Sequence, residues 1–293
     1  MNILLTGASR GIGAATLATL RAAGHRVAAH STAGDADLIA ADFADPAAPR
    51  RLWEAAFDRL DGRIDVLVNN AGVFEAVADN ASDEDWHAAW ARTLTINLQA
   101  SADLCRHAIA HFRSSDTQGG RIDVLVNNAG VFEAVADNAS DEDWHAAWAR
   151  TLTINLQASA DLTRHAIAHF RSSETQGGRI VNVASRAAYR GDSPMHWHYA
   201  ASKAGMIAMT KSIARGYAAE NILAFAVCPG FTATGMVEEY IASRGGEKLL
   251  ADIPLGRPAD PPEIAETIRW LACDAPPSAT GAVIDVNGAS YVR

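Results

Sequence analysis

The 293-residue sequence has few cysteines, no long apolar run and no cluster of basic residues, and each absence excludes a class of protein. Its three cysteines, Cys105, Cys228 and Cys273, form no Cys-x-x-Cys pair, which argues against a disulfide framework or a zinc site and favours the cytoplasm. No apolar stretch approaches the roughly 18 residues of a membrane span, and the apolar run directly after Met1 predicts that there is no signal peptide. The net charge of −9, from 25 basic and 34 acidic residues, disfavours nucleic acids and anionic membranes as partners.

An internal repeat is the first positive feature of the sequence. Residues 62–119 and 120–177 are identical except at Cys105/Thr163 and Asp116/Glu174. Two copies without caps are too few for a solenoid, so we interpret them as a tandem duplication. Removing one copy of 58 residues leaves 235, which predicts a single domain over residues 1–293 that carries one redundant copy.

Short apolar strands alternate with helices along the remaining chain. Strands are expected at 2–6, 25–30, 38–41, 64–68, 179–184, 222–227 and 283–286, and helices at 14–23, 46–60, 82–112, 199–218 and 262–273. Strands that are apolar throughout predict a parallel sheet covered on both faces. Right-handed crossovers then give a doubly wound, Rossmann-like α/β fold.

A glycine-rich segment, Thr6-Gly-Ala-Ser-Arg-Gly-Ile-Gly13, connects the first strand to the first helix. Gly7 allows a tight turn, Gly11 lets the backbone approach a pyrophosphate, and Gly13 lets the helix pack closely on the sheet. The N–H groups at the start of that helix attract phosphates. The segment therefore predicts a dinucleotide site, with Ser9, Arg10 and Ile12 in the same loop.

The end of the second strand indicates which dinucleotide binds. An acidic residue there would bind the ribose 2′-hydroxyl of NAD and repel a 2′-phosphate. This chain has Ser31 and Thr32 instead, with the first acid at Asp35, and Arg10 supplies a cation for a 2′-phosphate. The sequence therefore predicts NADP(H).

Tyr199 and Lys203 are four residues apart, hence on one face of a helix. A neighbouring ammonium group is expected to lower the tyrosine pKa from about 10 and make the phenol a general acid/base. Ser185, just past the fifth strand, could hydrogen-bond the substrate oxygen. A Tyr-x-x-x-Lys pair alone is weak evidence; together with the glycine-rich segment it is strong.

With these motifs the chain resembles the single-domain short-chain dehydrogenase/reductases, especially bacterial 3-oxoacyl-(acyl carrier protein) reductases. The resemblance also rests on Pro229-Gly230, Thr280-Gly281 and Val286-Asn287-Gly288. It implies that Tyr199 protonates the carbonyl oxygen, that Lys203 binds the nicotinamide ribose and that Ser185 polarises the carbonyl. An asparagine that holds a relay water corresponds to Asn97 or Asn155. The resemblance further implies cofactor contacts at Asp42, Phe43, Asn70, Ala71, Gly72, Asn128, Ala129, Gly130, Pro229, Gly230, Thr232 and Thr234.

The substrate is less well defined than the chemistry. Tyr189, Met195, His196 and Trp197, with the stretch 235–246, suggest a small or medium carbonyl or alcohol. Arg215 matches one position of a docking patch for an acidic carrier protein, but the net charge of −9 opposes such a partner. A 3-oxoacyl-carrier-protein reductase is therefore the second interpretation. A catalytically impaired cofactor-binding or assembly variant is the third. No metal site is predicted.

The redundant copy is expected to be extruded from the sheet. Inserting both strands would move Ser185 and Tyr199 away from the glycine-rich loop by one strand spacing, about 4.8 Å. We therefore expect one copy in the native position, with a weak preference for the first because it emerges first from the ribosome. The long helix suggests a homo-oligomer that the other copy could alter. Trp86/Trp90 and Trp144/Trp148 are expected to pack in the core.

Overall fold

An eight-stranded parallel sheet forms the centre of the protein in a computed structural model, which describes residues 1–73, 82–114, 122–172, 176–233 and 250–293. The strand order is β3-β2-β1-β4-β5-β6-β7-β8. The strands are β1 (Asn2–Leu5), β2 (Arg26–Ser31), β3 (Leu38–Ala40), β4 (Val66–Asn69), β5 (Val124–Asn127), β6 (Gly178–Val183), β7 (Ile222–Pro229) and β8 (Val283–Val286). The predicted doubly wound α/β fold is confirmed.

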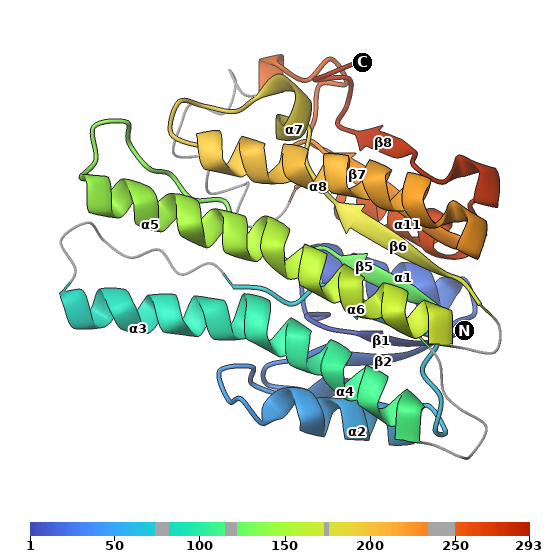
Figure 1. Cartoon of the computed structure of the whole chain (residues 1–293). Helices are drawn as coiled ribbons and strands as arrows, with labels where there is room; N and C mark the ends of the chain where they lie inside the picture. Colours follow the sequence, from blue (N-terminus) through green and yellow to red (C-terminus); the bar gives the residue numbers. More distant parts are fainter. Residues whose placement is uncertain (74–81, 115–121, 173–175, 234–249) are drawn as a thin grey trace.

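Helices cover both faces of the sheet (Figure 1). One face carries α2 (Ala48–Arg59), α4 (Ala100–Ser114), α6 (Ala158–Ser172) and α8 (Trp197–Tyr217); the other carries α1 (Gly11–Ala22) and α11 (Pro261–Arg269). The helices α3 (Asp83–Leu94) and α5 (Asp141–Leu152) continue into α4 and α6 through π-helical turns at Thr95–Gln99 and Thr153–Gln157, and α7 (Ala187–Arg190) precedes α8. Ser82 and Ser140 cap α3 and α5 by accepting a backbone N–H three residues on.

Both repeats contribute a strand to the sheet, so the expectation that one copy is extruded is wrong. β4 and β5 pair in register, with Val66 opposite Val124 and Asn69 opposite Asn127. The physical reason is burial: these strands are apolar on both faces, and an extruded copy would expose them to water. In-register pairing also keeps equivalent side chains in the same layer, since Leu67 and Leu125 lie in one core cluster and their valine neighbours in the other.

Both copies contribute helices to one layer as well as strands to the sheet. The helix α4 from the first copy packs between α2 and α6. Leu104 on α4 and Leu162 on α6 are both buried in the same core cluster. The second copy contacts the part of the fold that follows it in sequence, because α5 packs on α8 and β5 pairs with β6. The two copies therefore have different neighbours despite nearly identical sequences.

Candidate functional site

The glycine-rich turn forms a cradle at the N-terminus of α1. Gly7 and Gly11 have positive φ angles of 67° and 55°, which favour glycine. A Cβ on Gly13 would lie 2.0 Å from the Gly7 carbonyl oxygen. The Asn70 amide donates to the carbonyls of Thr6 and Gly7 at 3.0 and 2.9 Å, which fixes the turn from the side of β4. This geometry suits the close approach of a pyrophosphate.

His30 supports the same turn, a role that the sequence analysis missed. Its Nδ1 accepts the N–H of Gly7 at 3.2 Å, and its Nε2 lies 2.8 Å from the Ala41 carbonyl. Burial lowers the pKa of His30, so the neutral ring can accept at Nδ1 while donating at Nε2. Phe43, predicted in the adenine pocket, is buried and stacks on this ring at 4.4 Å. Asp42 is exposed.

The side chains around the end of β2 remain compatible with a 2′-phosphate. Arg10 and Thr32 are exposed, whereas Ser31 is buried and accepts the N–H of Gly34 at 3.0 Å. The first acid, Asp35, accepts the N–H groups of Asp37 and Leu38 through one carboxylate oxygen. That carboxylate is thus engaged in its own loop.

Ser185, Tyr199 and Lys203 come together at the carboxyl end of β6, as predicted. The Ser185 hydroxyl accepts the Ala187 N–H at 3.1 Å and acts to lower the pKa of the Tyr199 phenol. The Lys203 ammonium donates to the Val183 carbonyl at 2.9 Å and lies 5.9 Å from the centre of the Tyr199 ring. Burial lowers the pKa of Lys203 to about 8.

The predicted lowering of the Tyr199 pKa is wrong. Burial raises it to about 12, which outweighs the opposing effect of Ser185. Lys203 cannot reverse this, because burial also disfavours its own charge and it hydrogen-bonds a backbone carbonyl. Tyr199 is therefore held protonated at neutral pH, which suits a proton donor.

The structure brings only one of the two candidate asparagines to this cluster. The Asn155 amide donates to the Val131 carbonyl at 3.0 Å and to the Ser202 hydroxyl at 3.1 Å. A Cβ on Gly130 would lie 3.2 Å from Asn155 Oδ1 and 3.3 Å from Lys203 Nζ. Asn97 makes the equivalent bonds to the backbone of Val73, beside the first copy's turn. The weak preference for the first copy at the catalytic position is therefore wrong.

Phe132 and Trp144 of the second copy form an aromatic wall against two of the predicted substrate residues, His196 and Trp197. Phe132 stacks on His196 with ring centres 4.0 Å apart and meets the Tyr199 ring edge-on at 4.7 Å. His196 is therefore buried rather than open to a substrate. Trp197 is 49% exposed and contacts the Trp144 ring at 5.3 Å. Phe132 could not be singled out from the sequence, because the first copy has the same residue at the equivalent position.

Glu133, which follows Phe132 in the sequence, forms an ion pair with Arg150 at 2.8 Å, and each of the two side chains is 10% exposed. Burial raises the pKa of Glu133 and lowers that of Arg150 to about 10. Trp144 and Trp148 are only partly buried, so the expectation of simple core packing is wrong for this pair. The side chains of Trp86 and Trp90 lie outside the described part.

Tyr189 and Met195 contact different parts of the chain. Tyr189 stacks on Tyr291 at 5.5 Å, and its hydroxyl accepts from Arg293 at 3.2 Å. Met195 accepts the Val135 N–H through its backbone carbonyl at 2.9 Å. Tyr189 is thus tied to the C-terminal segment rather than to Tyr199.

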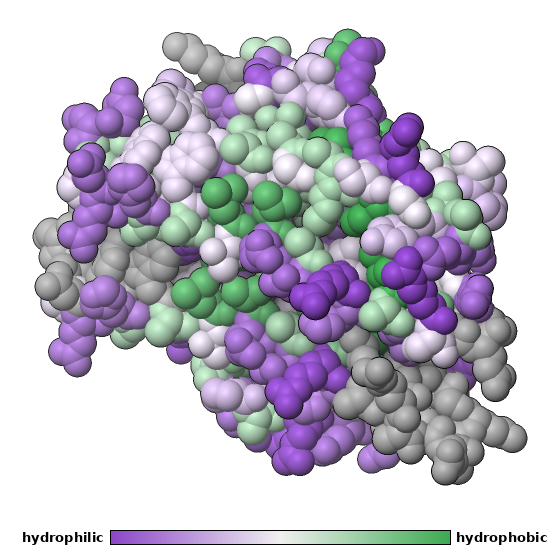
Figure 2. All heavy atoms as spheres, viewed as in Figure 1, coloured by the Kyte–Doolittle hydropathy of each residue, from purple (hydrophilic) through white to green (hydrophobic). Residues whose placement is uncertain are grey.

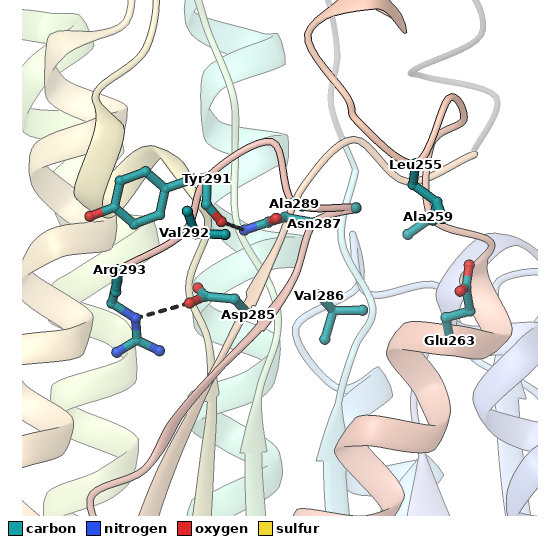
Figure 3. A pocket seen from close by; sticks show the side chains of 11 residues that line it. Leu255, Ala259, Glu263, Asp285, Val286, Asn287, Ala289, Tyr291, Val292 and Arg293 are labelled. Atoms are coloured by element: carbon teal, nitrogen blue, oxygen red, sulfur yellow. Dashed lines mark hydrogen bonds and ion pairs between the residues drawn. The ribbon is translucent and has the colours of Figure 1, made fainter.

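A cavity of about 700 Å³ lies at this C-terminal segment (Figure 3). Its lining includes Leu255, Glu263 and the ion pair of Asp285 with Arg293, whose charged groups point toward each other. It contains none of the predicted catalytic or cofactor-binding residues. The cavity therefore does not locate the active site, which is defined by the side-chain contacts above.

The remaining predicted residues lie along β7 and beyond. Gly230 donates its N–H to the Val286 carbonyl, and a Cβ there would lie 2.9 Å from the Asn287 backbone. Thr232 is buried and follows Pro229-Gly230. Thr234 and the stretch 235–246 lie outside the described residues. Cys228 is buried with a raised pKa, as expected of an inert core thiol. Within the described ranges there is no group of three metal-ligating side chains.

His198 gives a pH-dependent prediction about stability. Its burial, together with His196 and Arg150, lowers its pKa to about 4. The unfolded chain takes up this proton near pH 6.5 and the folded chain does not, so stability falls as pH decreases from 6.5 toward 4. We expect the Tm to fall less steeply over this interval in His198→Gln than in the parent. Equal slopes for the two proteins would show that His198 titrates normally in the folded state.

Comparison with known proteins gives two overlapping family matches. A family model described as short chain dehydrogenase matches residues 1–122, and one described as Enoyl-(Acyl carrier protein) reductase matches residues 110–289. The first match ends and the second begins around the junction of the two repeats. Among the described residues, no helix is long and apolar enough to cross a membrane.

Individual relatives agree with these matches. The chain is 41% identical over 170 residues to a 3-oxoacyl-[acyl-carrier-protein] reductase, FabG, of Thermotoga maritima, covering 58% of this chain and 66% of the relative. It is 30% identical over 289 residues to an acetoacetyl-CoA reductase of Shinella zoogloeoides, covering 98% of this chain and 97% of the relative.

Two solved structures are similar in fold. One, described as an NAD(P) dependent gluconate 5-dehydrogenase from Beutenbergia cavernae with bound NADP, has a TM-score of 0.63, 26% identity and coverage of 98% and 94%. The other is a 3-ketoacyl-(acyl-carrier-protein) reductase from Brucella melitensis complexed with NADH, with a TM-score of 0.62, 23% identity and coverage of 99% and 98%.

Proposed function

Because the chain belongs to the short chain dehydrogenase family and is an oxidoreductase of carbonyl and hydroxyl groups, we propose that it transfers hydride between NADP(H) and a small or medium carbonyl or alcohol. The observation that carries this proposal is the cluster of Ser185, Tyr199 and Lys203, in which Ser185 acts to lower the pKa of the Tyr199 phenol and Lys203 lies 5.9 Å from the centre of its ring. A protonated phenol at this place can donate to a carbonyl oxygen as the hydride arrives.

NADP(H) would supply the hydride, and the residues at the adenine end of the site fit it. Gly7 and Gly11 adopt positive φ angles, and a Cβ on Gly13 would clash with the Gly7 carbonyl oxygen, so the glycines form a tight turn at the N-terminus of α1, where backbone N–H groups attract phosphates. Arg10 is exposed and available for a 2′-phosphate, and no acid stands in the three positions that end and follow β2. The NADP found in the Beutenbergia structure supports the same choice.

The chain's own residues divide the remaining work. Tyr199 donates its hydroxyl proton to the substrate oxygen, and Ser185 orients that oxygen by a second hydrogen bond. Lys203, held by the Val183 carbonyl, contributes positive charge beside the ring. Asn155 holds the backbone at Val131 and the Ser202 hydroxyl, next to Lys203.

The test is oxidation of NADPH against a panel of ketones, aldehydes and 3-oxoacyl thioesters. It uses the 293-residue chain and a 235-residue version lacking residues 62–119, with single-turnover sensitivity. We expect carbonyl-dependent oxidation of NADPH, with NADH a poorer donor. Binding of NADPH without turnover of any carbonyl in either protein would defeat the proposal, and a strong NADH preference would overturn the cofactor assignment.

The two asparagines provide a matched pair of variants for the site. Asn155→Ala should lower kcat by at least about tenfold, because it removes hydrogen bonds that hold the backbone beside Lys203. Asn97→Ala should change kcat by less than about twofold, since its partners lie at the first copy's turn. Steady-state kinetics of both variants in the full chain make the comparison. Equal, mild losses would contradict the assignment.

A 3-oxoacyl-thioester reductase is the second candidate function. It is favoured by the relatives described as 3-oxoacyl-[acyl-carrier-protein] reductase and acetoacetyl-CoA reductase. The charge of −9 opposes an acidic carrier protein more than it opposes a coenzyme A thioester. Comparing the same 3-oxoacyl group on the two carriers would separate these substrates.

Domain organisation and assembly complete the proposal. We interpret residues 62–119 and 120–177 as a tandem duplication within one reductase domain of a cytoplasmic homo-oligomer. Figure 2 shows apolar residues gathered near the middle of the face that carries α3, α5 and α8, with hydrophilic residues toward its edges. An apolar surface of this kind supports pairing with a second subunit, which sedimentation analysis would test.

A further inference from the structure

We propose that the extra strand places the adenine-binding and catalytic ends of the site one strand too far apart, so that the 293-residue chain binds the adenine half of NADP(H) normally but transfers hydride slowly. This inference rests on the proposed function. Its basis is the strand order, which puts both β4 and β5 between β1, with its glycine-rich turn, and β6, with Ser185.

The two Asn-Asn-Ala-Gly turns divide contacts that a single turn would make. Asn70 in the first turn donates to the carbonyls of Thr6 and Gly7. Its counterpart Asn128 donates instead to the side-chain oxygen of Asn70, at 2.9 Å. Gly130 of the second turn is the one that lies against Lys203. The first turn thus serves the adenine-side cradle and the second turn serves the catalytic cluster.

The register of the sheet makes this separation purely lateral. Leu5 pairs with Val68, Val68 with Val126, and Val126 with Val181, so these residues of the four strands lie at the same level. No shift along the strands offsets the added width. The distance from β1 to β6 is therefore three strand spacings instead of two, an increase of about 4.8 Å.

A dinucleotide has a fixed reach, and hydride transfer requires the reacting atoms to approach to about 3–3.5 Å. Since a misplacement of 1 Å can cost about 100-fold in rate, one additional strand spacing is enough to suppress turnover. The adenine end is unaffected, because the cradle and Asn70 contact each other directly. Removal of either repeat should restore the spacing.

The repeats supply a built-in control, because deleting residues 62–119 or 120–177 gives proteins that differ only at Cys105/Thr163 and Asp116/Glu174. Calorimetry would compare binding of adenosine 2′,5′-bisphosphate and of NADPH to the full chain and both deletions. Stopped-flow measurements would follow single turnovers with the best carbonyl of the panel, and thermal melts would confirm folding.

We expect bisphosphate affinities within about threefold of one another and turnover at least about 100-fold faster in both deletions. The ratio of NADPH affinity to bisphosphate affinity should be larger in the two deletions than in the full chain. Equal turnover in all three proteins would overturn the inference. If none turns over any carbonyl, the proposed function fails, and an equal NADPH-to-bisphosphate affinity ratio in the three proteins would still overturn the inference separately.

Two variants of the full chain make the test independent of the folding of the deletions. Asn70→Ala should weaken bisphosphate binding by about tenfold, since it removes both bonds to the glycine-rich turn. Asn128→Ala should weaken that binding by less than about threefold, because Asn128 reaches the glycine-rich turn only through the side chain of Asn70. Equal losses in the two variants would show that the turns share the adenine-side role and would contradict the division.

Discussion

Replacing Tyr199 by phenylalanine should lower kcat/KM for carbonyl reduction by about 10²–10⁴-fold while leaving NADPH binding within about twofold. The substitution removes only the hydroxyl, and keeps the ring that packs against Phe132. Because the pKa of Tyr199 is raised to about 12, the parent phenol remains a proton donor across neutral pH. Reduction should therefore show no loss from phenol ionisation between pH 6 and 9.

The measurement is best made in a 235-residue deletion as well as in the full chain, so that a slow parent does not hide the effect. Tyr217→Phe is the matched control, since Tyr217 ends the same helix, where Arg171 lies over its ring. A Tyr199→Phe protein with parental kcat/KM would remove the phenol from the proposed chemistry.

Arg150→Met should destabilise the protein by about 3–5 kcal/mol, because it leaves the Glu133 carboxylate buried without its partner. Both side chains are 10% exposed, and burial already opposes the charge on each, so neither is well solvated alone. Urea unfolding at pH 7 would measure the loss.

The first copy again supplies the control. Arg92 has the same neighbours in sequence as Arg150, but it is exposed on α3. Arg92→Met should therefore cost less than about 1 kcal/mol. Equal losses at Arg92 and Arg150 would mean that the two copies have equivalent environments, against the placement of the second copy beside α8.

Much of the fold and the site could be predicted from local sequence. The strand at 283–286 has the predicted bounds, and the helix predicted at 199–218 differs from α8 by only two residues at its start and one at its end. The glycine-rich turn, Ser185, Tyr199 and Lys203 lie where motif spacing places them, because each is fixed by a turn or a helix within a few residues. These features depend on short-range geometry.

The neighbours of each repeat could not be predicted in the same way. Asn97 and Asn155 have the same flanking residues, so no local pattern distinguishes the asparagine beside Val73 from the one beside Ser202. We expected extrusion because an additional strand would disturb cofactor alignment, which affects function. The position of β4 and β5 follows instead from the burial of two apolar strands. The raised pKa of Tyr199 likewise depends on burial by the surrounding chain, including the ring of Phe132, which the spacing of Tyr199 and Lys203 does not contain.

The central claim is that both repeats lie in one sheet and separate its two halves. It is tested most directly by electron paramagnetic resonance distances between spin labels at Asp58 on α2 and Lys211 on α8, both exposed. The labels are attached through Asp58→Cys and Lys211→Cys, in a background where the partly exposed Cys273 is serine; Cys105 and Cys228 are buried. The account predicts a distance in the 293-residue chain that is longer than in the deletion of residues 62–119 by at least one strand spacing, about 4.8 Å. The same distance in both proteins would contradict it, because that is the result expected when one repeat lies outside the sheet.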